Sequence, residues 1–215
     1  MSDLNEYLAQ KRQALIERRE HAKANGTGPN TLRASARVEG RSGIRRIRIR
    51  DFQIISDSGP DFAGYDLGPT SPELQLGVLG SCLTHVFLIQ AASREVPLNS
   101  LEVEITAQID PRSGQLGFED VPVYPHNISY TVHIDSPASE EDIAALHEAV
   151  ERACPILNLL INPQQINGTI VHNTVEKAIQ ETPTPDRNEQ MNMVSLVTRM
   201  YRPEETRFSL RERYP

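Results

Sequence analysis

The stretch SPELQLGVLGSCLTHVFLIQAAS, residues 71–93, decides how this chain folds. Residues 74–93 carry no formal charge, and their apolar side chains would occur on every side of a helix. About 20 apolar residues can span a bilayer. However, this run also holds polar and small residues, namely Gln75, Gly77, Gly80, Ser81, Thr84, His85, Gln90 and Ser93. We therefore predict a central helix that begins at Pro72, ends before Pro97 and is surrounded by protein.

Composition excludes several classes of protein. The chain has 215 residues and a formal net charge of −7, which argues against a dedicated binder of nucleic acid or of anionic membranes. Its 2 cysteines lie far apart and form no CxxC pair, so a disulfide framework is not expected and a reducing compartment is the simplest context. The N-terminal segment is charged throughout and lacks an apolar signal-peptide core, so we expect a cytoplasmic protein.

The remaining pattern predicts an α+β fold. Alternating apolar side chains predict strands at residues 31–40, 44–56, 101–110 and 126–135, and a last strand at 166–173. A second helix is predicted over residues 139–160, with Ser139 as its N-cap. Antiparallel strands in the order β-β-α-β-β-α-β favour helices that pack on sheets.

Two extensions flank this predicted domain. Residues 1–29 hold an amphipathic helix over 2–24 with a thin apolar stripe, followed by a chain break at NGTGPN. The domain itself spans residues 30–175. Residues 176–215 are polar and punctuated by proline, and we expect a short helix only around residues 193–200.

The two cysteines are the main candidates for chemistry. A free cysteine on the apolar side of a helix is most often a small core residue. Cys82, however, follows Leu-Gly-Ser, whose small residues leave space for a ligand. Cys154 precedes Pro155, so the helix is expected to break there, and unpaired N–H groups of a restarted helix would stabilise a thiolate.

Other ionisable residues allow a structural or a functional interpretation. Glu73 can simply complement the dipole of the central helix. His85, one turn after Cys82, can be a base or a neutral core residue. The arginine-rich segment 33–50 fits a solvated strand face better than a nucleic-acid surface, because aromatic side chains are not interleaved with it. No pairing of cysteine and histidine has the spacing of a metal site.

Three segments resemble the OsmC/Ohr family, in the right order over residues 30–173. DFAGYDLGPTSPELQLGVLGSC, residues 61–82, resembles the family's Gly-rich loop, Pro-Glu-Leu helix start and first cysteine. VPLNSLEVEITAQID, residues 96–110, resembles the strand that follows, and ACPILNLLINP, residues 153–163, resembles the second-cysteine segment. Glu73 precedes the cysteine by nine residues, as in a third branch of the family, whereas OsmC and Ohr proper have ten.

This resemblance implies an OsmC-like domain in an intertwined homodimer, and a thiol peroxidase that reduces organic hydroperoxides. Cys82 matches the peroxidatic cysteine, Cys154 the resolving cysteine and Glu73 the acid at the helix start. Arg41 in the turn GRSG matches the activating arginine, with Arg45 and Arg46 as alternatives. The implied reductant is a dithiol such as dihydrolipoamide, and neither a metal nor another cofactor is expected.

The alternative function is a non-enzymatic ligand-binding or interaction protein on the same fold, in which the cysteines only pack. If the site exists, helix geometry predicts that two chains build it. Nine residues of straight helix separate Glu73 from Cys82 by about 13 Å of rise and roughly 180° of rotation. A partner's Glu73 would then have to reach Cys82, which a two-fold homodimer allows.

Overall fold

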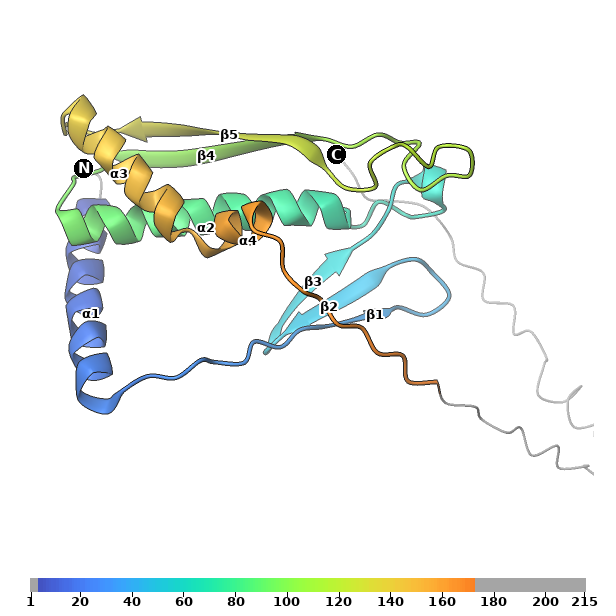
Figure 1. Cartoon of the computed structure of the whole chain (residues 1–215), viewed down its shortest axis with the longest axis horizontal. Helices are drawn as coiled ribbons and strands as arrows, with labels where there is room; N and C mark the ends of the chain where they lie inside the picture. The colour runs from blue at the N-terminus through green and yellow to red at the C-terminus, as the bar shows by residue number, and fades with distance from the viewer. Residues whose placement is uncertain (1–3, 173–215) are drawn as a thin grey trace, which may run out of the picture. The chain divides into compact units, whose positions relative to one another are not determined.

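The computed structural model describes residues 4–172 and divides the chain into two units, Met1–Ile166 and Asn167–Pro215 (Figure 1). All helices and strands described here lie in the first unit. In chain order they are α1 Leu4–Asn25, β1 Ser35–Val38, β2 Arg45–Ile49, β3 Phe52–Ser56, the 3₁₀ turn η1 Pro60–Phe62, α2 Ser71–Arg94, β4 Ser100–Gln108, β5 His126–Asp135, α3 Glu140–Ala153 and α4 Pro155–Ile161. This is the α+β fold predicted from the sequence.

The strands form two separate antiparallel sheets. The first has the order β1-β2-β3, and the second is the β4–β5 hairpin. In the hairpin, Val103 lies opposite Val132 and Ile105 opposite Tyr130. The side chains on this face pack against the core, whereas alternate residues of both strands are exposed, as the alternating pattern predicts.

Helix α2 is the centre of the core. It packs against α1, α3, α4 and β4, and its residues Leu79, Leu83, Val86 and Phe87 are buried. Figure 1 shows it running along the β4–β5 hairpin. Gly80 allows the close approach of β4, because a Cβ atom there would lie 3.3 Å from Ile105 Cγ1.

The ends of α2 follow its local sequence. Thr70 is the N-cap, and its side chain and that of Glu73 each accept a hydrogen bond from the other residue's backbone N–H, which is a capping box. Pro72 lies in the first turn, and Glu95 ends the helix in the left-handed conformation. The predicted start and end of the central helix are confirmed to within a few residues.

One side of α2 remains open within this single chain. Gly77, Val78, Ser81 and His85 are exposed on this side, and Val78 keeps 47% of its surface accessible. By length and composition alone α2 could cross a membrane. Its packing against four other elements favours a core helix that has one uncovered apolar stripe.

Two strand predictions were wrong. The expected single strand over residues 44–56 is two strands, because Arg50 adopts a positive φ of 54° and turns the chain between β2 and β3. The expected last strand is described over residues 166–172, and these residues do not form a strand. Alternation alone does not make a strand, since a strand also needs a neighbouring edge with which to pair.

The N-terminal helix with its thin apolar stripe is confirmed. Leu8 is buried, Leu4 and Leu15 pack against the core, and Tyr7 is 43% exposed. At the C-terminal end of α2, Glu95 pairs with Arg12 of α1 at 2.5 Å. Just beyond it, the backbone N–H of Leu98 donates to Asn5 Oδ1 at 2.9 Å. The N-terminal half of α1 therefore packs against the rest of the domain. The helix expected around residues 193–200 lies outside the described residues.

Candidate active site

Cys82 lies on the uncovered side of α2. It is partly exposed and lines a cavity of about 400 Å³ with Leu74, Gly77, Val78, Ser81, His85 and Ile156. The residues N-terminal to Cys82 are small or apolar, so the helix itself leaves space in front of the thiol. A small apolar molecule could reach the sulfur from this cavity.

Cys154 lies at the junction of α3 and α4, where the sequence predicted a break. It ends α3 and is the N-cap of α4, with an extended backbone (φ −73°, ψ 110°). Pro155 occupies the first turn of α4, where its missing N–H is not needed. The Cys154 sulfur accepts a hydrogen bond from the Leu157 N–H at 3.5 Å, and the residue is fully buried.

The fold brings the two cysteines into contact. Cys154 Sγ lies 3.5 Å from Cys82 Sγ, although 72 positions separate them in the chain. Both are free thiols. A disulfide bond needs a sulfur–sulfur distance of about 2.05 Å, so the two sulfurs would have to move closer and an oxidant would have to accept two electrons before they are joined.

The surroundings of Cys82 favour the neutral thiol in this chain. Burial raises the pKa of Cys82, and the adjacent Cys154 sulfur raises it further, since two neighbouring thiolates repel each other. A hydrogen bond from the Ile156 backbone N–H acts in the opposite direction. A peroxidase function requires a lowered pKa of Cys82, so a positive group that does not contact Cys82 within this single chain would have to approach it.

Asn158 is a residue that the sequence interpretation missed. Its side-chain amide donates to the backbone oxygens of Cys154 at 2.8 Å and Glu151 at 3.0 Å, and so bridges the end of α3 and the start of α4. Asparagine commonly bonds nearby backbone groups at helix ends. Its position four residues after a Cys-Pro break was the only local signal for this role.

Glu73 does not lie in the cavity of Cys82. Its Oε2 atom accepts hydrogen bonds from the Thr70 backbone N–H at 2.7 Å and from the Thr70 hydroxyl at 2.8 Å, and these bonds lower the pKa of Glu73. Glu73 instead lines a separate cavity of about 560 Å³, formed with residues of the 58–62 and 107–113 segments. The capping box at the start of α2 therefore explains the position of Glu73 without any catalytic role.

The three candidate arginines differ in their contacts. Arg45 donates to Ser56 Oγ at 3.1 Å and to the Asp57 backbone oxygen at 2.8 Å. Arg46 pairs with Glu39 at 2.8 Å and also donates to Gln53 at 2.6 Å. Arg41 is exposed in the turn between β1 and β2.

Within residues 4–172, Arg41 has neither a hydrogen bond nor an ion pair, and none of these three arginines contacts Cys82. The structure thus brings together Cys82 and Cys154, but neither Glu73 nor an arginine joins them. His85 shares the Cys82 cavity. In the same described part of the chain, no group of three or more potential ligands could hold a metal ion.

Comparison with known proteins relates this domain to a family. Residues 64–168 match the family model described as OsmC-like protein. An OsmC-like protein from Mycoplasma pneumoniae has a similar structure, with a TM-score of 0.53 and 21% identity over 62% of this chain and 89% of that one. A candidate osmotic stress induced and detoxification response protein from Psychrobacter arcticus has a TM-score of 0.50 and 15% identity, over 64% and 93% of the two chains.

A third similar structure is an organic hydroperoxide resistance protein OsmC from Legionella pneumophila, with a TM-score of 0.47 and 13% identity over 63% of this chain and 92% of that one. A search of curated proteins found no match. The family match over residues 64–168 and the similar structures show that this chain contains an OsmC-like domain.

Proposed function

We propose that this protein is a cysteine peroxidase that reduces organic hydroperoxides. The contact between Cys82 and Cys154 is the observation that carries the proposal. The family resemblance of the two cysteine segments supports the same roles. Cys82, which is accessible from a cavity, attacks the peroxide, and the buried Cys154 resolves the product.

The reaction divides into two steps. The Cys82 thiolate attacks one peroxide oxygen, the O–O bond breaks, and the alkoxide leaves and takes up a proton as the alcohol. The resulting Cys82 sulfenic acid then reacts with the Cys154 thiol, forming a disulfide and releasing water. A dithiol such as dihydrolipoamide, which the resemblance implies, returns both cysteines to thiols and is itself oxidised to a disulfide.

The activating groups come, in this proposal, from a second copy of the chain. Glu73 and Cys82 lie on one continuous helix and line different cavities, which supports a site shared between subunits. The exposed Val78 on α2, together with Leu159, Leu160 and Ile161 on α4, offers an apolar surface for that partner. The partner's Arg41 and Glu73 would stabilise the Cys82 thiolate and the departing alkoxide.

A non-enzymatic role on the same fold is the second candidate. It is favoured by the raised pKa of Cys82 and by the engagement of Glu73 in its own helix cap. In this case the cavity in front of Cys82 would bind an apolar ligand, and the cysteines would serve as packing residues.

Thiol titration separates the two functions. Free thiols would be counted before and after one equivalent of cumene hydroperoxide is added to the whole protein. Simultaneous loss of both thiols supports the peroxidase, and retention of both supports the binding protein. Loss of one thiol, stable in time, would contradict the resolving role of Cys154.

A further inference from the structure

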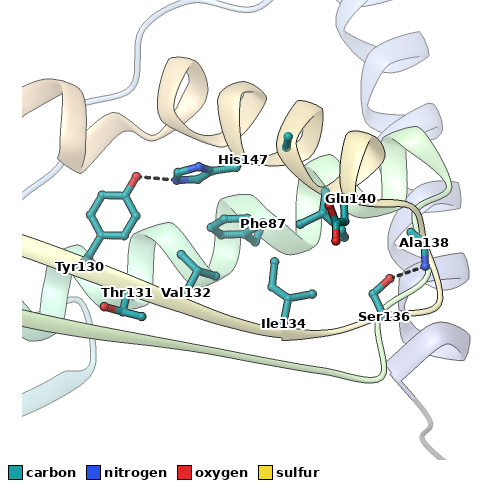
Figure 2. A pocket seen from close by; sticks show the side chains of 11 residues that line it. Phe87, Tyr130, Thr131, Val132, Ile134, Ser136, Ala138, Glu140 and His147 are labelled. Atoms are coloured by element: carbon teal, nitrogen blue, oxygen red, sulfur yellow. Dashed lines mark hydrogen bonds between the residues drawn. The ribbon is translucent and has the colours of Figure 1, made fainter.

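A partly exposed polar cluster lies between α3 and β5 and is not used in the chemistry above. It consists of Tyr130 on β5 and of His147 and Glu151 on α3. The Tyr130 hydroxyl donates to Glu151 Oε1 at 2.7 Å and lies 2.8 Å from His147 Nε2 (Figure 2). Since its single proton is directed to Glu151, the hydroxyl oxygen must accept a hydrogen bond from His147 Nε2–H.

The cluster also contacts the central helix. The His147 ring stacks on Phe87 of α2, with ring centroids 6.0 Å apart and planes 7° apart. Tyr130 meets the same imidazole edge-on at 5.8 Å. Figure 2 shows His147 between the Tyr130 hydroxyl and Phe87, at one end of a groove of about 680 Å³. One imidazole thus links α2, α3 and β5.

The cluster lies directly before Cys154 in the helix. His147, Glu151 and Cys154 are spaced by four and then three residues, so they share one face of α3. The side chain of Glu151 is bound to β5 through Tyr130, and its backbone oxygen accepts from Asn158 at 3.0 Å. The last turn of α3 is therefore held from both sides, immediately before the residue whose sulfur touches Cys82.

The Tyr130 hydroxyl remains a donor under ordinary conditions. Burial raises the pKa of Tyr130, and its hydrogen bond to the Glu151 carboxylate raises it further. The tether between β5 and α3 consequently does not depend on ionisation of the phenol at neutral pH.

We propose that Tyr130, His147 and Glu151 are positioning residues for disulfide formation, which hold the end of α3 so that Cys154 Sγ stays against Cys82 Sγ. This inference rests on the proposed function for its place in the reaction. In the step concerned, the Cys154 sulfur bonds to the Cys82 sulfur and the S–O bond of the sulfenic acid breaks. The hydroxide that leaves takes the Cys154 proton and departs as water.

The proposal separates the two steps of the reaction. Attack on the peroxide needs the Cys82 thiolate and its cavity, and the position of Cys154 affects this step only through the pKa of Cys82. Disulfide formation needs both sulfurs in one geometry, and its rate depends on how often that geometry is populated. Loss of the tether should slow the second step much more than the first.

The test is Tyr130→Phe, which keeps the ring beside His147 and removes the hydroxyl. We expect Cys82 sulfenic acid to form at a rate within about twofold of the wild-type rate, and disulfide formation to slow by about five- to tenfold, as expected for the loss of one or two hydrogen bonds. Rapid mixing with cumene hydroperoxide, followed by dimedone trapping and mass spectrometry, measures both steps. The matched control is Tyr124→Phe, because Tyr124 is 62% exposed in the loop before β5.

A conservative pair of variants distinguishes positioning from general support of the fold. The amide oxygen of Glu151→Gln can still accept from Tyr130, so its disulfide rate should lie near wild type, whereas Glu151→Ala should behave like Tyr130→Phe. Equal slowing of both chemical steps, with a lower melting temperature, would indicate a merely structural role and overturn the proposal. An unchanged disulfide rate in Tyr130→Phe would also overturn it.

A second oxidant keeps this test independent of the peroxidase proposal. Diamide oxidises two neighbouring thiols to a disulfide without peroxide and is itself reduced to the hydrazine. If the wild-type protein forms no Cys82 sulfenic acid, the proposed function fails. Slower diamide-driven closure in Tyr130→Phe than in Tyr124→Phe would still support the positioning role, and equal rates would refute it.

Discussion

The two candidate groups on α2 have very different surroundings. Cys82, in the middle of the helix, meets Cys154, a residue 72 positions away that no local pattern links to it. Glu73, at the start of the helix, meets Thr70, three residues away, in a capping box. The position of Glu73 is explained by ordinary helix chemistry, whereas the meeting of the two sulfurs requires the whole core to assemble.

This difference indicates which part of the proposed active site a single chain can build. The sulfur pair is complete within the described residues. The acid and the arginine are not beside it, and the uncovered side of α2 is where a partner would have to bring them. The sulfur pair and the groups expected from a partner can be tested separately, beginning with the largest expected effect.

Replacement of Cys82 by serine should abolish peroxide turnover, because the attacking sulfur is lost. Replacement of Cys154 by serine should permit one oxidation and leave a sulfenic acid on Cys82. Mass spectrometry after one equivalent of peroxide distinguishes the two variants. If Cys154 in the Cys82→Ser protein is oxidised as fast as in the wild type, the two roles have been assigned the wrong way round.

Mixed dimers test whether the site is shared. Chains carrying Glu73→Ala and chains carrying Cys82→Ser should each be nearly inactive alone. After equal mixing and re-association, half of the dimers would be heterodimers with one complete site, so about a quarter of the wild-type activity should return. No recovery in a sample shown to contain heterodimers, or full activity of a monomer, would refute the shared site.

The arginine variants should affect different properties of the protein. Arg41→Ala should raise the pKa of Cys82 in the assembled protein and slow its alkylation near neutral pH by about tenfold, equivalent to about one pKa unit. The measurement is the rate of iodoacetamide labelling against pH. A silent Arg41→Ala together with a strong effect of Arg46→Ala would mean that the hairpin has been matched wrongly to the family.

Arg45→Ala is the matched comparison for Arg41→Ala. Because Arg45 bonds to Ser56 and Asp57 within its own chain, its loss should lower the free energy of unfolding by about 1–3 kcal/mol. Urea unfolding measures this change. Equal stability of Arg45→Ala and Arg41→Ala would contradict the structural role of Arg45.

The helix cap should show the smallest effect. Thr70→Ala removes the N-cap of α2 and should lower the free energy of unfolding by about 1 kcal/mol, whereas Thr70→Ser keeps the hydroxyl and should preserve most of the stability. Thermal melts compare the two variants. Disulfide formation between Cys82 and Cys154 should be unchanged in both, since their contact does not involve the cap.

The sequence determined those features that depend on neighbouring residues. The apolar residues and Pro72 were sufficient for α2, Ser139 was sufficient for the start of α3, and the alternating pattern was sufficient for β4 and β5 as separate strands. Cys-Pro was sufficient for the break between α3 and α4, because proline cannot supply an interior helix N–H. The local sequence singled out the two cysteines, and the family resemblance implied their roles and the OsmC-like fold, which the structure has.

Only the tertiary structure decided what distant residues do to one another. The positive φ of Arg50 divided a continuous apolar and basic pattern into two strands, and the amide of Asn158 joined α3 to α4. No local pattern indicated that Tyr130 on β5 would bind Glu151 on α3, or that Cys82 would lie 3.5 Å from Cys154. Local preferences arise from backbone sterics and nearby hydrogen bonds, whereas these contacts depend on how α2, α3 and β5 pack into one core.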